Sequence, residues 1–154
     1  MAAGAREAPP VINGTPTAGQ PIELSVGLPH NLGTRIHLHL TILATSIMLF
    51  LSSATLDGAQ AGAAMSSFVY AMPDRYNPSQ PLTTSLYTQP SSQDFSTRLA
   101  KVVVRRTGKL CYVGGSINLA NAVCGGTVDE EMEAFRAIVG VVAAEVAKAR
   151  GAKE

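Results

Sequence analysis

The sequence has 154 residues, of which 46% are hydrophobic and 15% are charged, and its formal net charge is +1. This length fits one domain with a modest core, and the apolar composition excludes a globally disordered chain. The near-neutral charge gives no long-range attraction to nucleic acid or to anionic membranes. Because so few charges are available to cover the surface, we expect some apolar surface to meet a partner.

The beginning of the chain is rich in Ala, Gly and Pro and has no hydrophobic period. We therefore expect a flexible leader over residues 1–20, a single domain over 21–150 and a short tail over 151–154. No positively charged start leads into an apolar segment, so we expect no secretory signal and a reducing compartment.

Period-two alternation predicts strands over residues 22–26 and 34–42. The segment 47–51 is apolar at every position, which is typical of a central strand that is covered on both faces. Residues 67–72 and 82–87 also fit strands. The apolar stretch 36–54 is interrupted by histidines and hydroxyl residues, so two strands joined at 44–46 explain it better than a membrane span.

The hydrophobic period then changes to that of a helix. Asp94 is the expected cap of a helix that Gly108 ends in a left-handed conformation. A strand over 110–113 follows, with either a bulge or a close backbone approach at Gly114 and Gly115, and a short strand is expected over 117–123.

A terminal helix is the best specified element, since Thr127 and Glu130 form a capping box at its start. We expect one continuous apolar face along it, and close packing around Gly140 within it. The expected face consists of Val128, Met132, Phe135, Val139, Val142 and Val146.

This order of elements predicts an α+β fold, with an antiparallel β-sheet of about six strands and two α-helices packed on one face. The fully apolar segment 47–51 then implies that a second subunit covers the other face, which would serve for dimerisation. Strand parity decides whether Met48 and Phe50 lie at that interface, or else the alternate set. The candidate interface residues are Ile47, Met48, Leu49, Phe50 and Leu51.

We find no recognisable set of catalytic residues in the sequence, so we expect neither an enzyme nor a cofactor. His37 and His39 would lie on one face of a strand and could share a metal, but no third ligand is evident. Cys111 and Cys124 are too few and too widely spaced for a zinc site, and we expect free thiols that pack as small hydrophobes.

A basic stripe runs along the helix expected after Asp94, because Arg98, Lys101 and Arg105 are spaced at helical intervals. Such a stripe is usually a solvated surface. The alternative is a docking strip for an acidic patch on a partner protein.

Five blocks in order carry a resemblance to a known family. They are Met72-Pro73-Asp74-Arg75-Tyr76-Asn77, Pro81-Leu82-Thr83-Thr84-Ser85-Leu86, Thr97-Arg98-Leu99-Ala100-Lys101, Lys109-Leu110-Cys111-Tyr112-Val113 and Glu130-Glu131-Met132-Glu133-Ala134-Phe135. In this combination the sequence resembles the proteasome assembly chaperone 4 family. It departs from the family's pattern in its longer leader and in a helix that runs on well past Phe135.

The resemblance implies a non-catalytic chaperone of the cytoplasm, and of the nucleus as well, for assembly of the alpha ring of the 20S proteasome. It implies a heterodimer with a proteasome assembly chaperone 3-like subunit, and binding to an alpha-type subunit, of which the fifth is expected. Arg75 and Tyr76 join the basic stripe as candidate docking residues. The alternative function is a dimeric α+β scaffold subunit of a trafficking or signalling complex.

Overall fold

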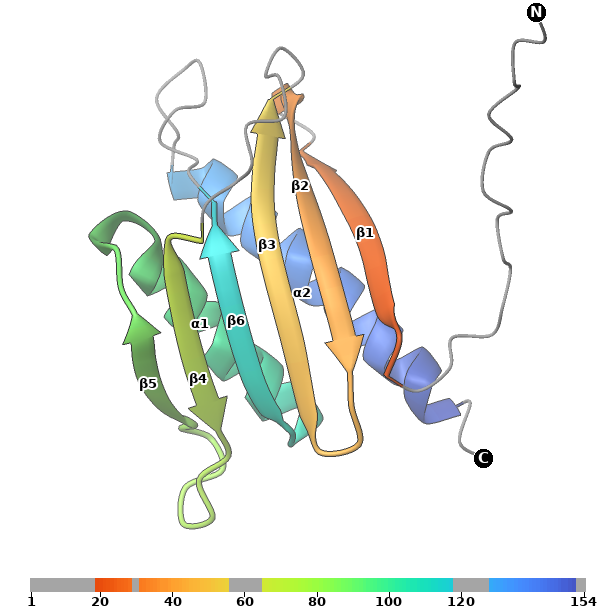
Figure 1. The fold of residues 1–154 in the computed structure, drawn as a ribbon, viewed down its shortest axis with the longest axis vertical. Helices are drawn as coiled ribbons and strands as arrows, with labels where there is room; N and C mark the ends of the chain where they lie inside the picture. Colours follow the sequence, from red (N-terminus) through yellow and green to blue (C-terminus); the bar gives the residue numbers. More distant parts are fainter. Residues whose placement is uncertain (1–18, 29–30, 56–64, 118–127, 152–154) are drawn as a thin grey trace, which may run out of the picture.

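The computed structural model describes residues 19–28, 31–55, 65–117 and 128–151, and the account below is confined to these residues. They form six strands and two helices in one α+β domain (Figure 1). The elements are β1 (Pro21–Leu28), β2 (Asn31–Ile42), β3 (Ser46–Thr55), β4 (Ser67–Met72), β5 (Leu82–Tyr87), α1 (Pro90–Thr107), β6 (Leu110–Ser116) and α2 (Val128–Gly151).

The six strands form one sheet in the order β1-β2-β3-β6-β4-β5. All neighbours pair antiparallel except β3 and β6, which run parallel. The sheet is thus mostly antiparallel, and the sequence-based prediction is confirmed in class but not for this one pair. The parallel pair arises because the chain forms the β4–β5 hairpin and α1 before β6 returns between β3 and β4.

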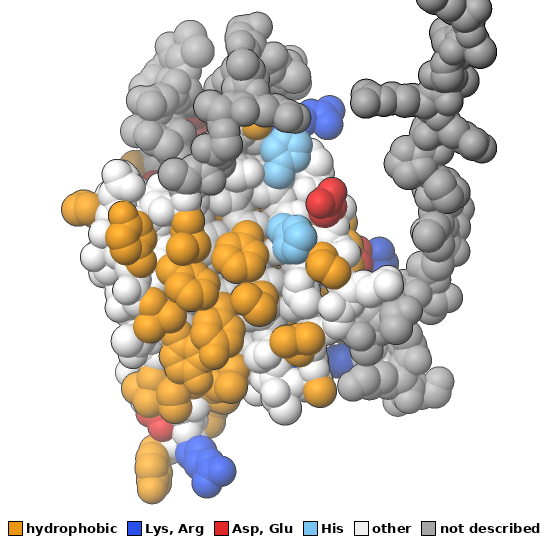
Figure 2. All heavy atoms as spheres, in the orientation of Figure 1, with side chains coloured by type: hydrophobic (Ala, Val, Ile, Leu, Met, Phe, Trp, Pro, Cys, Tyr) orange, Lys and Arg blue, Asp and Glu red, His pale blue; other side chains and the backbone are white. Residues whose placement is uncertain are grey.

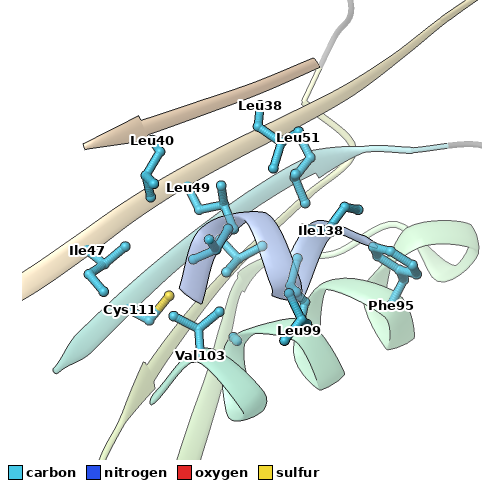
Figure 3. Packing of buried hydrophobic residues seen from close by; sticks show 14 of the residues in the cluster. Leu38, Leu40, Ile47, Leu49, Leu51, Phe95, Leu99, Val103, Cys111 and Ile138 are labelled. Atoms are coloured by element: carbon cyan, nitrogen blue, oxygen red, sulfur yellow. The ribbon is translucent and has the colours of Figure 1, made fainter. Parts of the chain in front are cut away.

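Both helices pack on the same face of the sheet, and the core lies between the two layers (Figure 1). Figure 3 shows Ile47, Leu49 and Leu51 of β3 on the side of the sheet where Leu99 of α1 and Ile138 of α2 lie. All five side chains are buried. The predicted packing of two helices on one face is therefore confirmed.

The start of α1 differs from the prediction. Its cap is Gln89 and its first turn contains Pro90, whereas Asp94 lies inside the helix and its carboxylate is 2.9 Å from the Arg98 guanidinium. Proline suits the first turn because its missing N–H would have no partner there anyway. The predicted end is confirmed, since Gly108 has φ 70° and its N–H donates to the Val104 carbonyl at 2.8 Å.

The buried face of α2 follows the expected residues from Phe135 onward. Phe135 is half-buried and meets Phe95 of α1 at a centroid distance of 5.7 Å, and Val139, Val142 and Val146 are buried. Val128 and Met132 are 78% and 37% exposed, so their predicted burial is wrong. The buried stripe instead continues toward the start of α2 through two other residues, Ile138 and Ala134. One turn before Ala134, Glu131 pairs with Arg98 of α1.

Several predicted features lie outside the described residues. These are most of the leader at 1–18, Cys124, Thr127 of the capping box, residues 118–123 of the last expected strand and the tail at 152–154. Among the helices that the structure describes, none has the length and hydropathy needed to cross a membrane.

Gly140 was expected to allow close packing, and this prediction is wrong. The residue is exposed on α2, and an added Cβ would meet no heavy atom within 4 Å. Glycine at this position therefore costs helix stability, and no close contact requires it.

We accordingly expect Gly140→Ala to raise the free energy of unfolding by about 0.5–1 kcal/mol, because alanine loses less backbone entropy in a helix. Urea denaturation measures the change. The matched control is Gly108→Ala, which should lower the same free energy by about 1 kcal/mol because alanine is strained at positive φ. A lower stability of Gly140→Ala would contradict this account of α2.

Candidate functional site

The face of the sheet opposite the helices is apolar over one half of its width. The strands β3, β4, β5 and β6 contain no Asp, Glu, Lys or Arg. Figure 2 shows hydrophobic side chains gathered over this half, whereas histidine and charged side chains lie over β1 and β2. We call this side of the sheet the open face.

The structure shows which residues of β3 face the helices and which face the open side of the sheet. Ile47, Leu49 and Leu51 are 0%, 0% and 4% exposed and belong to the core beneath the helices, so they are removed from the interface candidates. Met48 and Phe50 alternate with them and are half-buried on the open face. Their role in dimerisation stays a prediction.

Four aromatic residues form a row across β3, β4 and β6, and we call it the aromatic row. Phe50 and Phe68 stack with centroids 6.2 Å apart, Phe68 lies 6.0 Å from Tyr112, and Tyr112 lies 4.9 Å from Tyr70. His39 of β2 adds an edge contact to Phe50 at 6.3 Å. Each ring contact contributes about 0.5–1.5 kcal/mol beyond its buried area, so the row presents a preformed surface.

The aromatic row depends on a glycine. Gly114 is paired with Phe50 on one side and with Phe68 on the other, and an added Cβ would lie 2.6 Å from Phe50 Cδ1. On the opposite face, a Cβ at Gly115 would lie 2.9 Å from Ser96 Oγ of α1. The close approach predicted for this glycine pair is therefore confirmed on both faces of β6.

A hollow on the open face adjoins this glycine. It has a volume of about 340 Å³, and Phe50, Met65, Gly114 and Ser116 are among the residues that line it. The space directly above Gly114 is taken by the Phe50 ring and the Met65 sulfur, which would lie 2.6 and 3.0 Å from an added Cβ. A hollow of this size and lining can accept one apolar side chain from a partner.

Reactive groups are sparse on the open face. His37 and His39 share it, as the sequence predicted, with Ser25 and Glu23 opposite them on β1. Among the residues that the structure describes, no three side chains of the metal-binding types are grouped closely enough to hold an ion.

The basic stripe of α1 divides into two parts. Arg98 contacts the carboxylates of Asp94 and of Glu131, so it links α1 to α2 and its charge is neutralised. Lys101 is half-buried and Arg105 is exposed. Docking by this stripe stays a prediction, and Arg98 already has carboxylate partners within the chain.

Arg75 and Tyr76 lie outside α1, in the loop between β4 and β5, and both are exposed. The structure thus separates the candidate docking residues into two regions. The sequence-based reasoning did not single out Phe68, Tyr70 and Tyr112, although Phe68 and Tyr70 at alternate positions of one predicted strand were a usable signal.

We expect Gly114→Ala to lower the free energy of unfolding by about 1–3 kcal/mol, because the new methyl group overpacks against the Phe50 ring. Thermal or urea denaturation provides the measurement. The matched control is Gly27→Ala on β1, where an added Cβ meets nothing within 4 Å.

A double variant identifies the contact responsible. When Phe50→Ala accompanies Gly114→Ala, the cost of the added methyl group should largely disappear because the clashing ring is gone. If the two costs simply add, the packing described for this glycine is incorrect.

A further expectation concerns Cys111, which is buried on the helix side of β6. Burial raises the pKa of its thiol to about 12, so the reactive thiolate is scarce near neutral pH. Alkylation followed by peptide mass spectrometry should leave Cys111 unmodified in the folded chain and label it after denaturant is added. Rapid labelling of the folded chain would show that this part of the core opens readily.

The family model for proteasome assembly chaperone 4 matches residues 35–117, which is more than half of the chain and spans the sheet from β2 to β6. No curated protein sequence matches the chain.

A chain in a crystal structure of a chaperone complex for yeast 20S proteasome assembly has a similar fold. Its TM-score is 0.51 at 18% sequence identity, over 65% of this chain and 76% of that chain. The match to a chaperone family favours assembly of the proteasome over the alternative of a trafficking or signalling scaffold. The chain belongs to the proteasome assembly chaperone 4 family.

Proposed function

We propose that the chain acts as a non-catalytic chaperone in assembly of the alpha ring of the proteasome core particle. In this proposal it forms a heterodimer with a proteasome assembly chaperone 3-like subunit and holds an alpha-type subunit, the fifth being expected. The site of action would be the cytoplasm, and the nucleus as well. The family match supports the general role, and the open face supports the pairing.

The observation that best supports pairing with a second chaperone subunit is the uncharged half of the open face. An interface of ordinary size buries about 800 Å² on each partner, and its centre is poor in charged residues and rich in aromatic ones. The strands β3, β4 and β6 supply such a centre in the aromatic row and in Met48. The charged and histidine residues of β1 and β2 would form its polar rim.

The partner that fits this surface is a second sheet with an apolar face. Two sheets stack face to face about 10 Å apart, with side chains from the two inner faces packed between them. Such a partner would place its side chains against the aromatic row and would fill the hollow beside Gly114.

The test is to place one carboxylate in the centre of the open face. Phe50→Asp should reduce binding to the chaperone 3-like subunit by at least about 100-fold, because docking would bury an unpaired charge. Isothermal titration calorimetry measures the affinity. Circular dichroism and thermal denaturation show whether the monomer stays folded, which is expected because residue 50 points away from the helix-side core.

The matched control is Ala144→Glu, which adds one carboxylate at an exposed position of α2 on the other layer. It should leave the affinity unchanged. A folded Phe50→Asp variant that pairs as tightly as the unaltered chain would exclude the open face as the interface.

A further inference from the structure

The loop over residues 73–81, between β4 and β5, exposes an aromatic residue almost completely. Tyr76 is 99% exposed, whereas the aromatic residues of β4 and β6 are half-buried or packed in the aromatic row. Figure 1 shows this loop extending beyond the ends of β4 and β5. An aromatic ring held entirely in water gives no packing energy to this domain.

The loop is nevertheless built to hold a fixed shape. The Tyr76 N–H donates to Asp74 Oδ1 at 2.9 Å, and the Ser79 hydroxyl donates to Asn77 Oδ1 at 2.7 Å. The Gln80 N–H closes a turn by donating to the Asn77 carbonyl at 3.0 Å. Three prolines, at positions 73, 78 and 81, restrict the backbone further.

A loop held in this way loses little conformational entropy when it binds. Its backbone is ordered in advance by turns and prolines, and a tyrosine side chain has only two rotatable angles to fix. Tyrosine and arginine are also the residues that most often dominate the energy of an interface. The exposed pair Arg75 and Tyr76 therefore has the properties of a binding anchor.

The position of the loop separates it from the open face. It projects along the direction of the strands, past the end of the sheet (Figure 1), so a second sheet stacked on the open face would leave its tip uncovered. At its base, Met72 pairs with Leu82 across β4 and β5, and these side chains are 37% and 52% exposed. The loop can therefore engage another protein while the open face is occupied.

Charge indicates the chemistry of that protein. No carboxylate in the described part of the chain forms an ion pair with Arg75, and Asp74 already accepts the backbone N–H of Tyr76. The tip thus presents a guanidinium, unpaired within the described part of the chain, beside an aromatic ring, and the Asp74 carboxylate next to them keeps its negative charge. The complementary surface is an apolar socket rimmed by carboxylates.

We propose that Arg75 and Tyr76 form the anchor that holds the alpha-type subunit, while the open face holds the chaperone 3-like subunit. This inference rests on the proposed function, which supplies both partners. It assigns the client contact to the loop over 73–81 rather than to the basic stripe of α1.

The experiment uses the purified heterodimer and the isolated fifth alpha-type subunit, with binding measured by surface plasmon resonance. Tyr76→Ala should weaken binding by about tenfold or more, because the ring is the larger part of the anchor. Tyr76→Phe should bind nearly as well as the unaltered chain. Arg75→Glu should weaken binding more at low salt than at high salt, since it reverses an exposed charge.

The matched control is Arg136→Glu, the same charge reversal at an exposed position of α2. It should leave binding unchanged, and none of the variants should alter affinity for the chaperone 3-like subunit. Normal client binding by both Tyr76→Ala and Arg75→Glu would overturn the inference while leaving the proposed function intact. Loss of pairing with the chaperone 3-like subunit in Tyr76→Ala would also overturn it, because the loop would then belong to the dimer interface.

The unaltered heterodimer provides the separate test of the underlying proposal. Failure of this heterodimer to bind the alpha-type subunit would contradict both the inference and the client part of the proposed function. If the unaltered heterodimer binds the alpha-type subunit and both loop variants lose this binding, the result supports the inference and the client part of the proposed function.

Discussion

A sheet of six strands has two faces, and both helices of the described chain lie on one of them. On the covered face, Leu49 and Leu99 belong to a continuous buried core. On the other face, β3, β4 and β6 carry aromatic and other uncharged residues that no element of the described chain covers. Since burying apolar surface is the main favourable term in protein association, this imbalance makes a partner sheet the expected complement.

The open face is also ordered before any partner arrives. Its rings lie in a row because Gly114 leaves room for the Phe50 ring, so the packing that stabilises the monomer also shapes the surface that would dock. A rigid surface loses little entropy on binding. The loop that carries Tyr76 follows the same principle by different means, since turns and prolines rather than ring contacts hold it.

Much of the fold was predictable, because period-two and helical periods are local properties of the sequence. The class, the two helices on one face and the glycine pair of β6 were all inferred correctly. The parity of β3 was not decidable, because Met48 and Phe50 are as apolar as the core residues that alternate with them. The parallel pairing of β6 depends on the path of the chain through space, which no local pattern records. The exposure of Met132 likewise follows from how α2 packs against α1, where Phe135 rather than Met132 meets Phe95 at a centroid distance of 5.7 Å.

The most direct test of the central claim is hydroxyl-radical footprinting of the chain alone and with the proposed chaperone 3-like partner. Methionine, phenylalanine and tyrosine react readily, so Met48, Phe50 and Tyr112 report on the open face and Tyr76 reports on the loop. The account predicts that the first three become protected in the pair while Tyr76 stays as reactive as before. Unchanged labelling of Met48, Phe50 and Tyr112 in a confirmed heterodimer would contradict it.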